Sequence, residues 1–173
     1  MALYGEARDI SLFRHINREL MGNIISQECA FYKYRLAETK VNMYGEASEG
    51  RFFQEPVLLN AIIEVGDQNA PVQDGNVGFT WPITFKFLRD DLVDANVVPE
   101  FGDIIFYQNA YWEIDNTNLI QFFTGKDPDY PYYDDNGNNP LNPGLENFGW
   151  NASVICFTHY VPSDRVNIQL SRQ

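Results

Sequence analysis

The sequence contains two histidines, and acid–base or nucleophilic catalysis near neutral pH would most readily use one of them. His15 lies beside Arg14 in a stretch with helical spacing, and His159 lies in a run that alternates apolar and polar residues. A Ser-His-Asp or Cys-His system needs a histidine that acts as base for a neighbouring nucleophile. Neither position marks such a system, so we interpret both histidines as structural.

The two cysteines, Cys29 and Cys156, each lie inside an apolar alternating stretch and are far apart in the sequence. Cysteine without a disulfide is among the residue types that are most often buried. We therefore predict two buried strand thiols in preference to a disulfide or a catalytic nucleophile.

Motifs for nucleotide or zinc binding are absent from the sequence. It has no G-x-G-x-x-G or G-x-x-x-x-G-K-[ST] phosphate loop, and no H-E-x-x-H or paired C-x-x-C spacing. Acidic residues are plentiful, so a carboxylate pair for glycoside hydrolysis stays open, although nothing selects one pair above the others. We expect no cofactor and no bound metal.

A long irregular stretch, residues 125–149, contains four Pro and four Gly. Loops longer than about 12–15 residues are usually functional or disordered in compact domains. Asp127, Asp129, Asp134 and Asp135 offer hard oxygen ligands that suit Ca²⁺, but their order does not match the EF-hand loop. A solvated loop or a subunit contact is the preferred interpretation.

Charge is unevenly distributed along this chain, whose formal net charge is −12. Residues 1–40 hold six basic and five acidic residues, whereas residues 41–173 hold six basic and nineteen acidic residues. Tight nucleic-acid binding depends on clustered Lys and Arg, which this balance does not favour. The first ten residues, MALYGEARDI, show no basic region followed by an apolar stretch, so we expect no secretory leader. No window approaches the roughly 20 apolar residues of a membrane helix. We therefore expect a soluble product of the cytoplasm that does not bind membranes.

The elements that position these residues are predicted to be mainly strands, because aromatic residues make up 15% of the chain and Val and Ile are frequent. One N-terminal helix is predicted over residues 9–26. Its apolar side carries Ile10, Phe13, Ile16, Leu20 and Ile24, and its other side carries Arg14, Arg18 and Glu19. The sequence leaves open whether this helix packs on its own sheet or on a neighbouring subunit.

Alternation with a period of two predicts a β core over residues 27–124 and 150–170. Pro82 is expected at a strand edge or bulge, because proline cannot donate a ladder hydrogen bond. Residues 102–115 are predicted to form a hairpin whose Ile104, Phe106, Trp112 and Ile114 point into the core. The whole chain, residues 1–173, is therefore predicted to be one mainly β domain. We expect a barrel or sandwich of about six to eight strands, with one N-terminal helix and long loops.

A resemblance to a known family rests on the order of three segments. These are IISQECAFYKYR at 24–35, PEFGDIIFY at 99–107 and YWEI at 111–114. The three segments follow a helix, and an apolar strand separates the first from the other two. In this order they resemble the neck proteins of T-even-like contractile-tailed bacteriophages. In that family, a strand that begins with P-x-x-G-D turns into a strand that ends in F/W-E-I. The resemblance covers roughly residues 20–120. This chain departs from the longer members by its shortness and by its own loop at 125–149.

The resemblance implies a non-enzymatic head-completion protein of the virion, assembled in the host cytoplasm as a hexameric ring. Such a ring would contact the portal or adaptor protein above and the tail terminator below, with packaged DNA passing through without specific binding. Under this interpretation the helix and the acidic loop supply the ring or channel interface. The candidate interface residues are Arg14, Arg18, Asp127, Asp129, Asp134 and Asp135.

Three other functions remain open at this stage. A tail terminator or a head-tail adaptor is also a small β-rich ring protein. A small carboxylate-dependent virion hydrolase is the enzymatic alternative. A calcium-stabilised baseplate or adhesion module would place its ion in the loop at 125–149.

Overall fold

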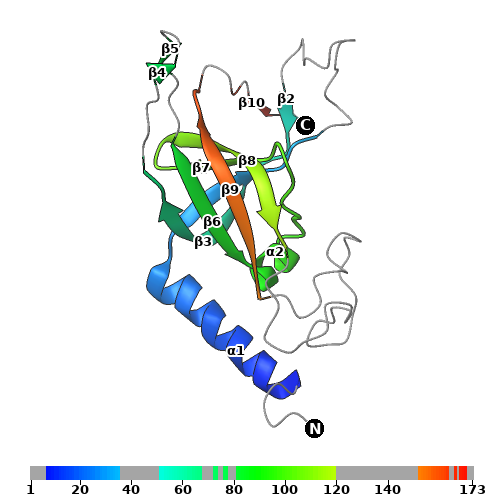
Figure 1. Ribbon diagram of the computed structural model, residues 1–173. Helices are drawn as coiled ribbons and strands as arrows, with labels where there is room; N and C mark the ends of the chain where they lie inside the picture. The colour runs from blue at the N-terminus through cyan, green and yellow to red at the C-terminus, as the bar shows by residue number, and fades with distance from the viewer. Residues whose placement is uncertain are drawn as a thin grey trace.

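Six strands of this chain, each with alternating inward and outward side chains, close into an antiparallel barrel (Figure 1). The structure is a computed structural model that describes residues 7–35, 51–67, 72–73, 76–77, 81–119, 152–163, 166 and 168–170. In spatial order the barrel strands are β1 (Glu28–Tyr32), β3 (Val57–Val65), β6 (Pro82–Leu88), β9 (Ser153–Val161), β8 (Ala110–Asn118) and β7 (Ile104–Tyr107). The prediction of a mainly β fold with an N-terminal helix is confirmed.

Closure of the barrel depends on β1, which pairs with β3 on one side and β7 on the other. Phe31 is in register with Val57 of β3 and with Ile105 of β7. Every strand of the barrel therefore has two neighbours, and the barrel has no open edge of unpaired backbone groups.

The barrel interior is filled by side chains from all six strands and from the segment that follows β6. This buried cluster comprises Cys29, Phe31, Leu59, Ala61, Ile83, Phe85, Phe87, Leu92, Val97, Ile105, Trp112, Ile114, Val154 and Cys156. Leu92 belongs to a short helix, α2 (Arg89–Asp94), which lies at the lower end of the barrel (Figure 1). Small barrels are packed cores and not pores, and this one follows that rule.

A second apolar cluster lies on the outside of the barrel. It consists of Phe53, Ile104, Val161 and Val166. Phe53 ends β2 (Arg51–Phe53), which pairs in parallel with β10 (Ile168–Leu170). A further hairpin of β4 (Val72–Gln73) and β5 (Asn76–Val77) extends from the β3–β6 connection.

The predicted hairpin at 102–115 is confirmed, with β7 and β8 joined at Gln108 and Asn109. Both turn residues have positive φ, 49° and 61°, as a two-residue type I′ turn requires. The expected inward direction is confirmed for Trp112 and Ile114 but is wrong for Ile104 and Phe106. Ile104 is buried in the second cluster, outside the barrel. Ile105 points into the barrel core, while Phe106 is half-buried on the outer side against Tyr111, at 4.9 Å between ring centroids.

The expected edge or bulge position of Pro82 is also wrong. Pro82 begins β6, a strand with β3 on one side and β9 on the other. The β3 ladder begins one residue later, at Ile83, so it does not require a donor at Pro82. The first residue of a strand is the other position that proline tolerates.

The N-terminal helix lies below the barrel (Figure 1). α1 (Ala7–Glu19) continues as a π-helical turn, η1 (Leu20–Ile25). Ser26 ends it in the left-handed region, with φ of 44°, and its N–H donates to the Met21 carbonyl at 2.8 Å. The chain then enters β1 two residues later.

Candidate subunit interface

The N-terminal helix is bound to its own barrel through its charged side. Arg14 donates from Nε and Nη2 to the two carboxylate oxygens of Asp90 on α2, each at 2.8 Å. Arg18 pairs with Asp91 at 3.5 Å and also with Asp94. Bidentate arginine–carboxylate pairs are among the stronger charge-assisted contacts, so the first of these fixes the orientation of the helix.

Asp90 is the centre of this clamp. It also accepts a hydrogen bond from the buried Arg89, at 2.7 Å from Nη2. Burial by itself raises the pKa of Asp90, but the hydrogen bonds from Arg14 and the charge of Arg89 outweigh it, so the pKa lies below its usual value. Burial and the nearby carboxylates raise the pKa of Asp91, although Arg18 opposes them.

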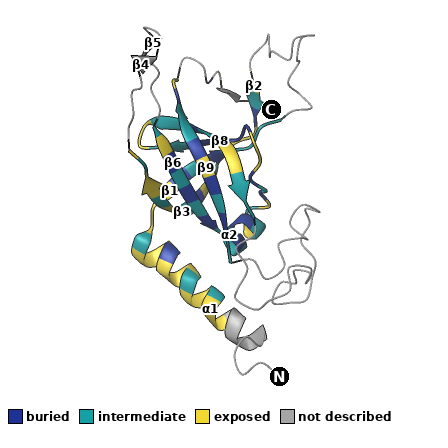
Figure 2. Ribbon diagram, viewed as in Figure 1, coloured by how far each residue is buried: buried dark blue, intermediate teal, exposed yellow. Residues whose placement is uncertain are grey.

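The apolar side of the helix faces away from the barrel. Among the described side chains of α1 and η1, Met21 is buried, whereas five large apolar side chains are between 41% and 75% exposed. We call these five the helix stripe: Leu12, Phe13, Ile16, Leu20 and Ile24. An amphipathic surface helix normally buries its apolar side against its own domain, so this helix has the opposite orientation (Figure 2).

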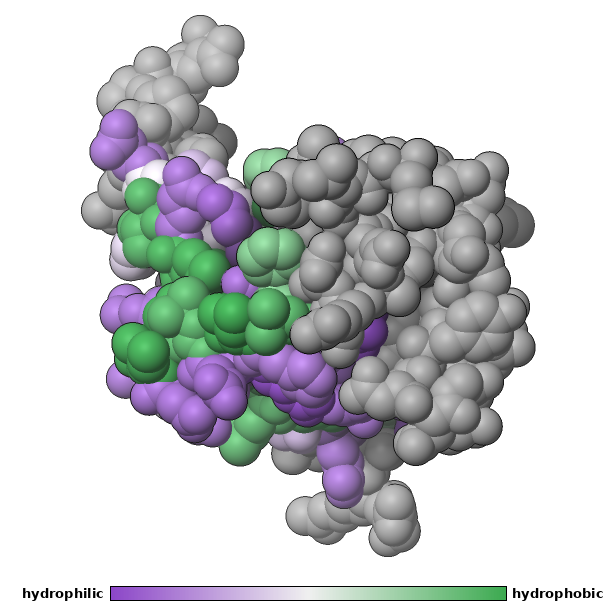
Figure 3. Space-filling view, turned by 90° about the horizontal axis from the view of Figure 1, so that it is seen from below, coloured by the Kyte–Doolittle hydropathy of each residue, from purple (hydrophilic) through white to green (hydrophobic). Residues whose placement is uncertain are grey.

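The helix stripe lies on a hydrophobic face of the molecule. Seen from below, where α1 lies, a continuous hydrophobic area is bordered by hydrophilic residues (Figure 3). η1 also contacts β3. The helix is therefore held at two places, by Arg14 and Arg18 on α2 in its middle and by η1 against β3 at its C-terminal end. The stripe cannot rotate inward without breaking these contacts.

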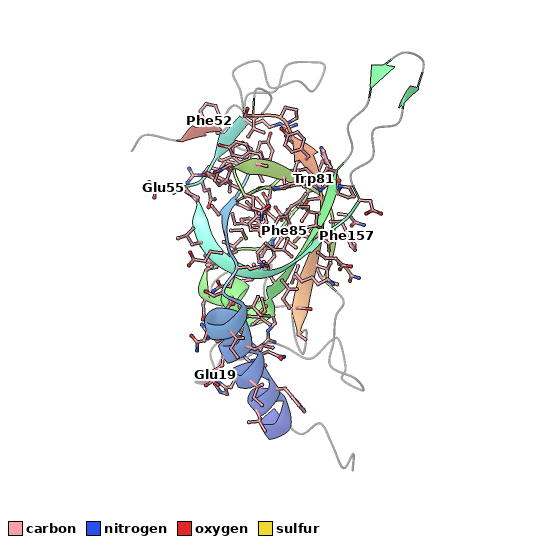
Figure 4. The ribbon with its side chains drawn as sticks, turned by 90° about the vertical axis from the view of Figure 1, so that its left-hand side faces the viewer. Glu19, Phe52, Glu55, Trp81, Phe85 and Phe157 are labelled. Atoms are coloured by element: carbon pink, nitrogen blue, oxygen red, sulfur yellow. The ribbon has the colours of Figure 1, made fainter. Side chains whose placement is uncertain are left out.

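A second set of exposed apolar side chains lies on the outer wall of the barrel. Leu58 and Ile62 project from β3, and Phe157 projects from β9. We call these three the wall patch. Figure 4 shows the contrast between Phe85, which lies inside the barrel, and Phe157, which lies on its outer side.

The Pro99–Asp103 segment, which contributes to the family resemblance, forms a buried polar latch. The Asp103 carboxylate is 1% exposed and accepts hydrogen bonds from the N–H groups of Tyr34 and Glu100, both at 2.8 Å. Lys33 Nζ lies 3.0 Å from the same carboxylate and also donates to Glu100 Oε2 at 2.7 Å. Burial raises the pKa of Asp103 even though these donors oppose it. The latch joins the end of β1 to the segment before β7.

The cysteines and histidines, which are the side chains most suited to catalysis, do not lie together in one site. Cys29 and Cys156 are free thiols in the barrel core, so their predicted burial is confirmed. Burial raises the pKa of Cys29 to about 12 and raises that of Cys156 as well, which keeps both thiols protonated. His15 is exposed on α1, and His159 Nδ1 lies 2.7 Å from Asp115 Oδ1 on the outer surface. Within the described ranges, no three His, Cys, Asp or Glu side chains form a possible metal site.

Of the candidate interface residues predicted from the sequence, the structure locates two. Arg14 and Arg18 hold α1 to α2, and their role at a ring interface stays a prediction. Asp127, Asp129, Asp134 and Asp135 lie outside the described residues. The periodic spacing of the helix stripe could be seen in the sequence. Its outward direction could not, because it depends on ion pairs with α2, and the helix sequence does not show which segment its arginines bind.

Comparison with family models and with curated proteins finds no match for this chain. In the described part of the chain, no helix combines the length and the apolar character needed to span a membrane.

Proposed function

We propose that this chain is a structural virion protein that forms a homo-oligomeric ring, a hexamer, in the neck of a contractile-tailed bacteriophage. The ring would lie between the portal or adaptor protein above and the tail terminator below. It would close the DNA-filled head and receive the tail, after assembly in the host cytoplasm. The order of sequence segments supports the family, and the outward helix stripe supports self-assembly.

The observation that carries the self-assembly part is the outward direction of the helix stripe. Its five side chains expose apolar area on the order of 500 Å², near the upper end of what soluble monomers present. Stable interfaces bury about 800 Å² on each partner. The helix stripe and the polar residues that border it are of the size expected for one side of a subunit contact.

Charge supports a ring through which DNA passes. The segment 41–173 holds thirteen more acidic than basic residues. A channel formed by an acidic body repels phosphates and lets DNA move without adhering. The proposal involves no catalytic step. A tail terminator or head-tail adaptor ring would use the same contact and is the alternative.

Light scattering coupled to size-exclusion chromatography tests self-assembly. We expect the wild-type chain to have the mass of a ring, about 120 kDa for six copies of a 20.0 kDa chain. An Ile16→Glu/Leu20→Glu variant should be monomeric, because two carboxylates in the helix stripe would have to be desolvated at the interface.

The matched control is Phe101→Glu. Phe101 is 74% exposed and belongs to the Pro99–Asp103 latch, which contacts Tyr34 at the opposite end of β1 from η1. This variant should assemble as the wild-type chain does. A wild-type chain that elutes at 20.0 kDa across a hundredfold range of concentration would contradict the proposal.

A further inference from the structure

We infer that the helix stripe of one copy packs on the wall patch of the next copy of this chain, so that the two patches form a head-to-tail contact. The inference rests on the proposed function and names the partner surface within it. The two patches consist of different residues, since the helix stripe belongs to α1 and η1 and the wall patch belongs to β3 and β9. A contact between different surfaces is heterologous, and it generates a closed ring when its rotation closes.

The structure excludes the chain's own wall as the partner of its own helix stripe. Arg14 and Arg18 bind α2 through the opposite side of the helix, which turns the stripe outward. At the C-terminal end of the helix, the Gln27 carbonyl accepts a hydrogen bond from the Ala61 N–H at 2.9 Å, directly after η1. With these contacts in place, the stripe is available to another molecule.

The chemistry of the wall patch suits an apolar helix. Ile62 is in register with Lys86 of β6, and Lys86 is in register with Ile155 of β9. Lys86 already pairs with Glu64 at 2.7 Å, so its charge is compensated and its aliphatic stem lies between two isoleucines. Phe157 lies opposite Thr84 in the next row of the same outer face.

Electrostatics favours helix-to-wall contact between copies over contact between two barrel walls. The helix segment Ala7–Glu19 holds three arginines and two acidic residues, while residues 41–173 hold six basic and nineteen acidic residues. Bringing the helix of one copy to the wall of another therefore avoids the repulsion that two acidic bodies would experience.

A lipid surface is the less suitable occupant. Interfacial helices bind anionic membranes through basic residues that flank the apolar side. The described basic side chains of α1, Arg14 and Arg18, are instead paired with three carboxylates of α2. A chain with a net charge of −12 would also be repelled by an anionic lipid surface.

The test mixes two variants that each lack one half of the contact. The helix variant is Ile16→Glu/Leu20→Glu, and the wall variant is Ile62→Glu/Phe157→Glu. All four side chains are at least 40% exposed, so both variants should melt within a few degrees of the wild-type chain. Each variant alone should be a 20.0 kDa monomer in light scattering.

An equimolar mixture should give a 1:1 complex of about 40 kDa, twice the 20.0 kDa chain mass, and nothing larger. The wall variant keeps an intact helix stripe and the helix variant keeps an intact wall patch, so one contact remains per pair. Leu58→Glu, at a side chain that is 65% exposed, provides a second wall variant that should behave in the same way. Phe101→Glu should assemble like the wild-type chain.

Two results would overturn the inference while leaving the proposed function intact. One is a wild-type ring whose wall variants still assemble fully. The other is a pair of monomeric variants that do not combine when mixed, as expected if helix packs on helix. A monomeric wild-type chain would instead overturn the proposed function, and the inference with it.

Discussion

A Phe85→Ala variant should lose about 3–5 kcal/mol of its free energy of unfolding, the range for truncating a fully buried aromatic side chain. Phe85 is 0% exposed and lies inside the closed barrel (Figure 4). Its ring packs against Phe87 at 6.4 Å and against Tyr107 at 6.0 Å between centroids. Alanine would leave a cavity that a barrel closed on all sides cannot collapse to fill. Urea unfolding followed by tryptophan fluorescence measures the change.

Phe106→Ala is the matched control, since it removes the same atoms from the outer side of the barrel. Phe106 is half-buried against Tyr111, so its loss should cost about 1 kcal/mol or less, the value of a cross-strand aromatic pair. Equal losses for the two variants, or a larger loss for Phe106→Ala, would contradict the register of β7 and the closure of the barrel.

Asp103→Ala should be the second large effect, with a loss of about 1–3 kcal/mol, because it leaves buried backbone donors without their acceptor. Lys33 would lose one carboxylate at 3.0 Å but keep Glu100 at 2.7 Å. The N–H groups of Tyr34 and Glu100 would lose their acceptor in a site that water reaches poorly. The variant should therefore loosen the end of β1, and thermal unfolding measures this loss.

Asp115→Ala provides the control for removal of a carboxylate. Asp115 pairs with His159 at 2.7 Å, but their side chains are 49% and 42% exposed. Exposed pairs contribute little to stability, so this variant should melt close to the wild-type temperature. An Asp103→Ala variant that also melts at the wild-type temperature would contradict a stabilising role for the latch.

Local patterns were sufficient to predict the hairpin, the helix and the buried thiols. Gln108 and Asn109 separate two apolar runs by two residues, which is a short-range signal that needs no distant contact. Alternation placed Cys29 and Cys156 among apolar neighbours, and both are in the core. These elements depend on residues close in sequence, where periodicity is informative.

Features that depend on distant segments could not be predicted. Ile104 and Ile105 are adjacent and both buried, because Ile104 is covered by Phe53, Val161 and Val166 on the outside of the barrel. Because two adjacent residues are both buried, alternation could not show which of them faces the barrel interior, and the directions expected for Ile104 and Phe106 were wrong. The outward orientation of the helix stripe likewise depends on carboxylates of α2, which lie 76 residues further along the chain.

Electron microscopy of the purified wild-type chain tests the central claim most directly. Class averages should show closed rings with sixfold symmetry and a central opening, because heterologous contacts between identical copies close around one axis. The Ile16→Glu/Leu20→Glu variant should give no rings under the same conditions. Isolated single-barrel particles, or twofold dimers without an opening, in the wild-type sample would contradict the proposal that this chain is a neck ring protein.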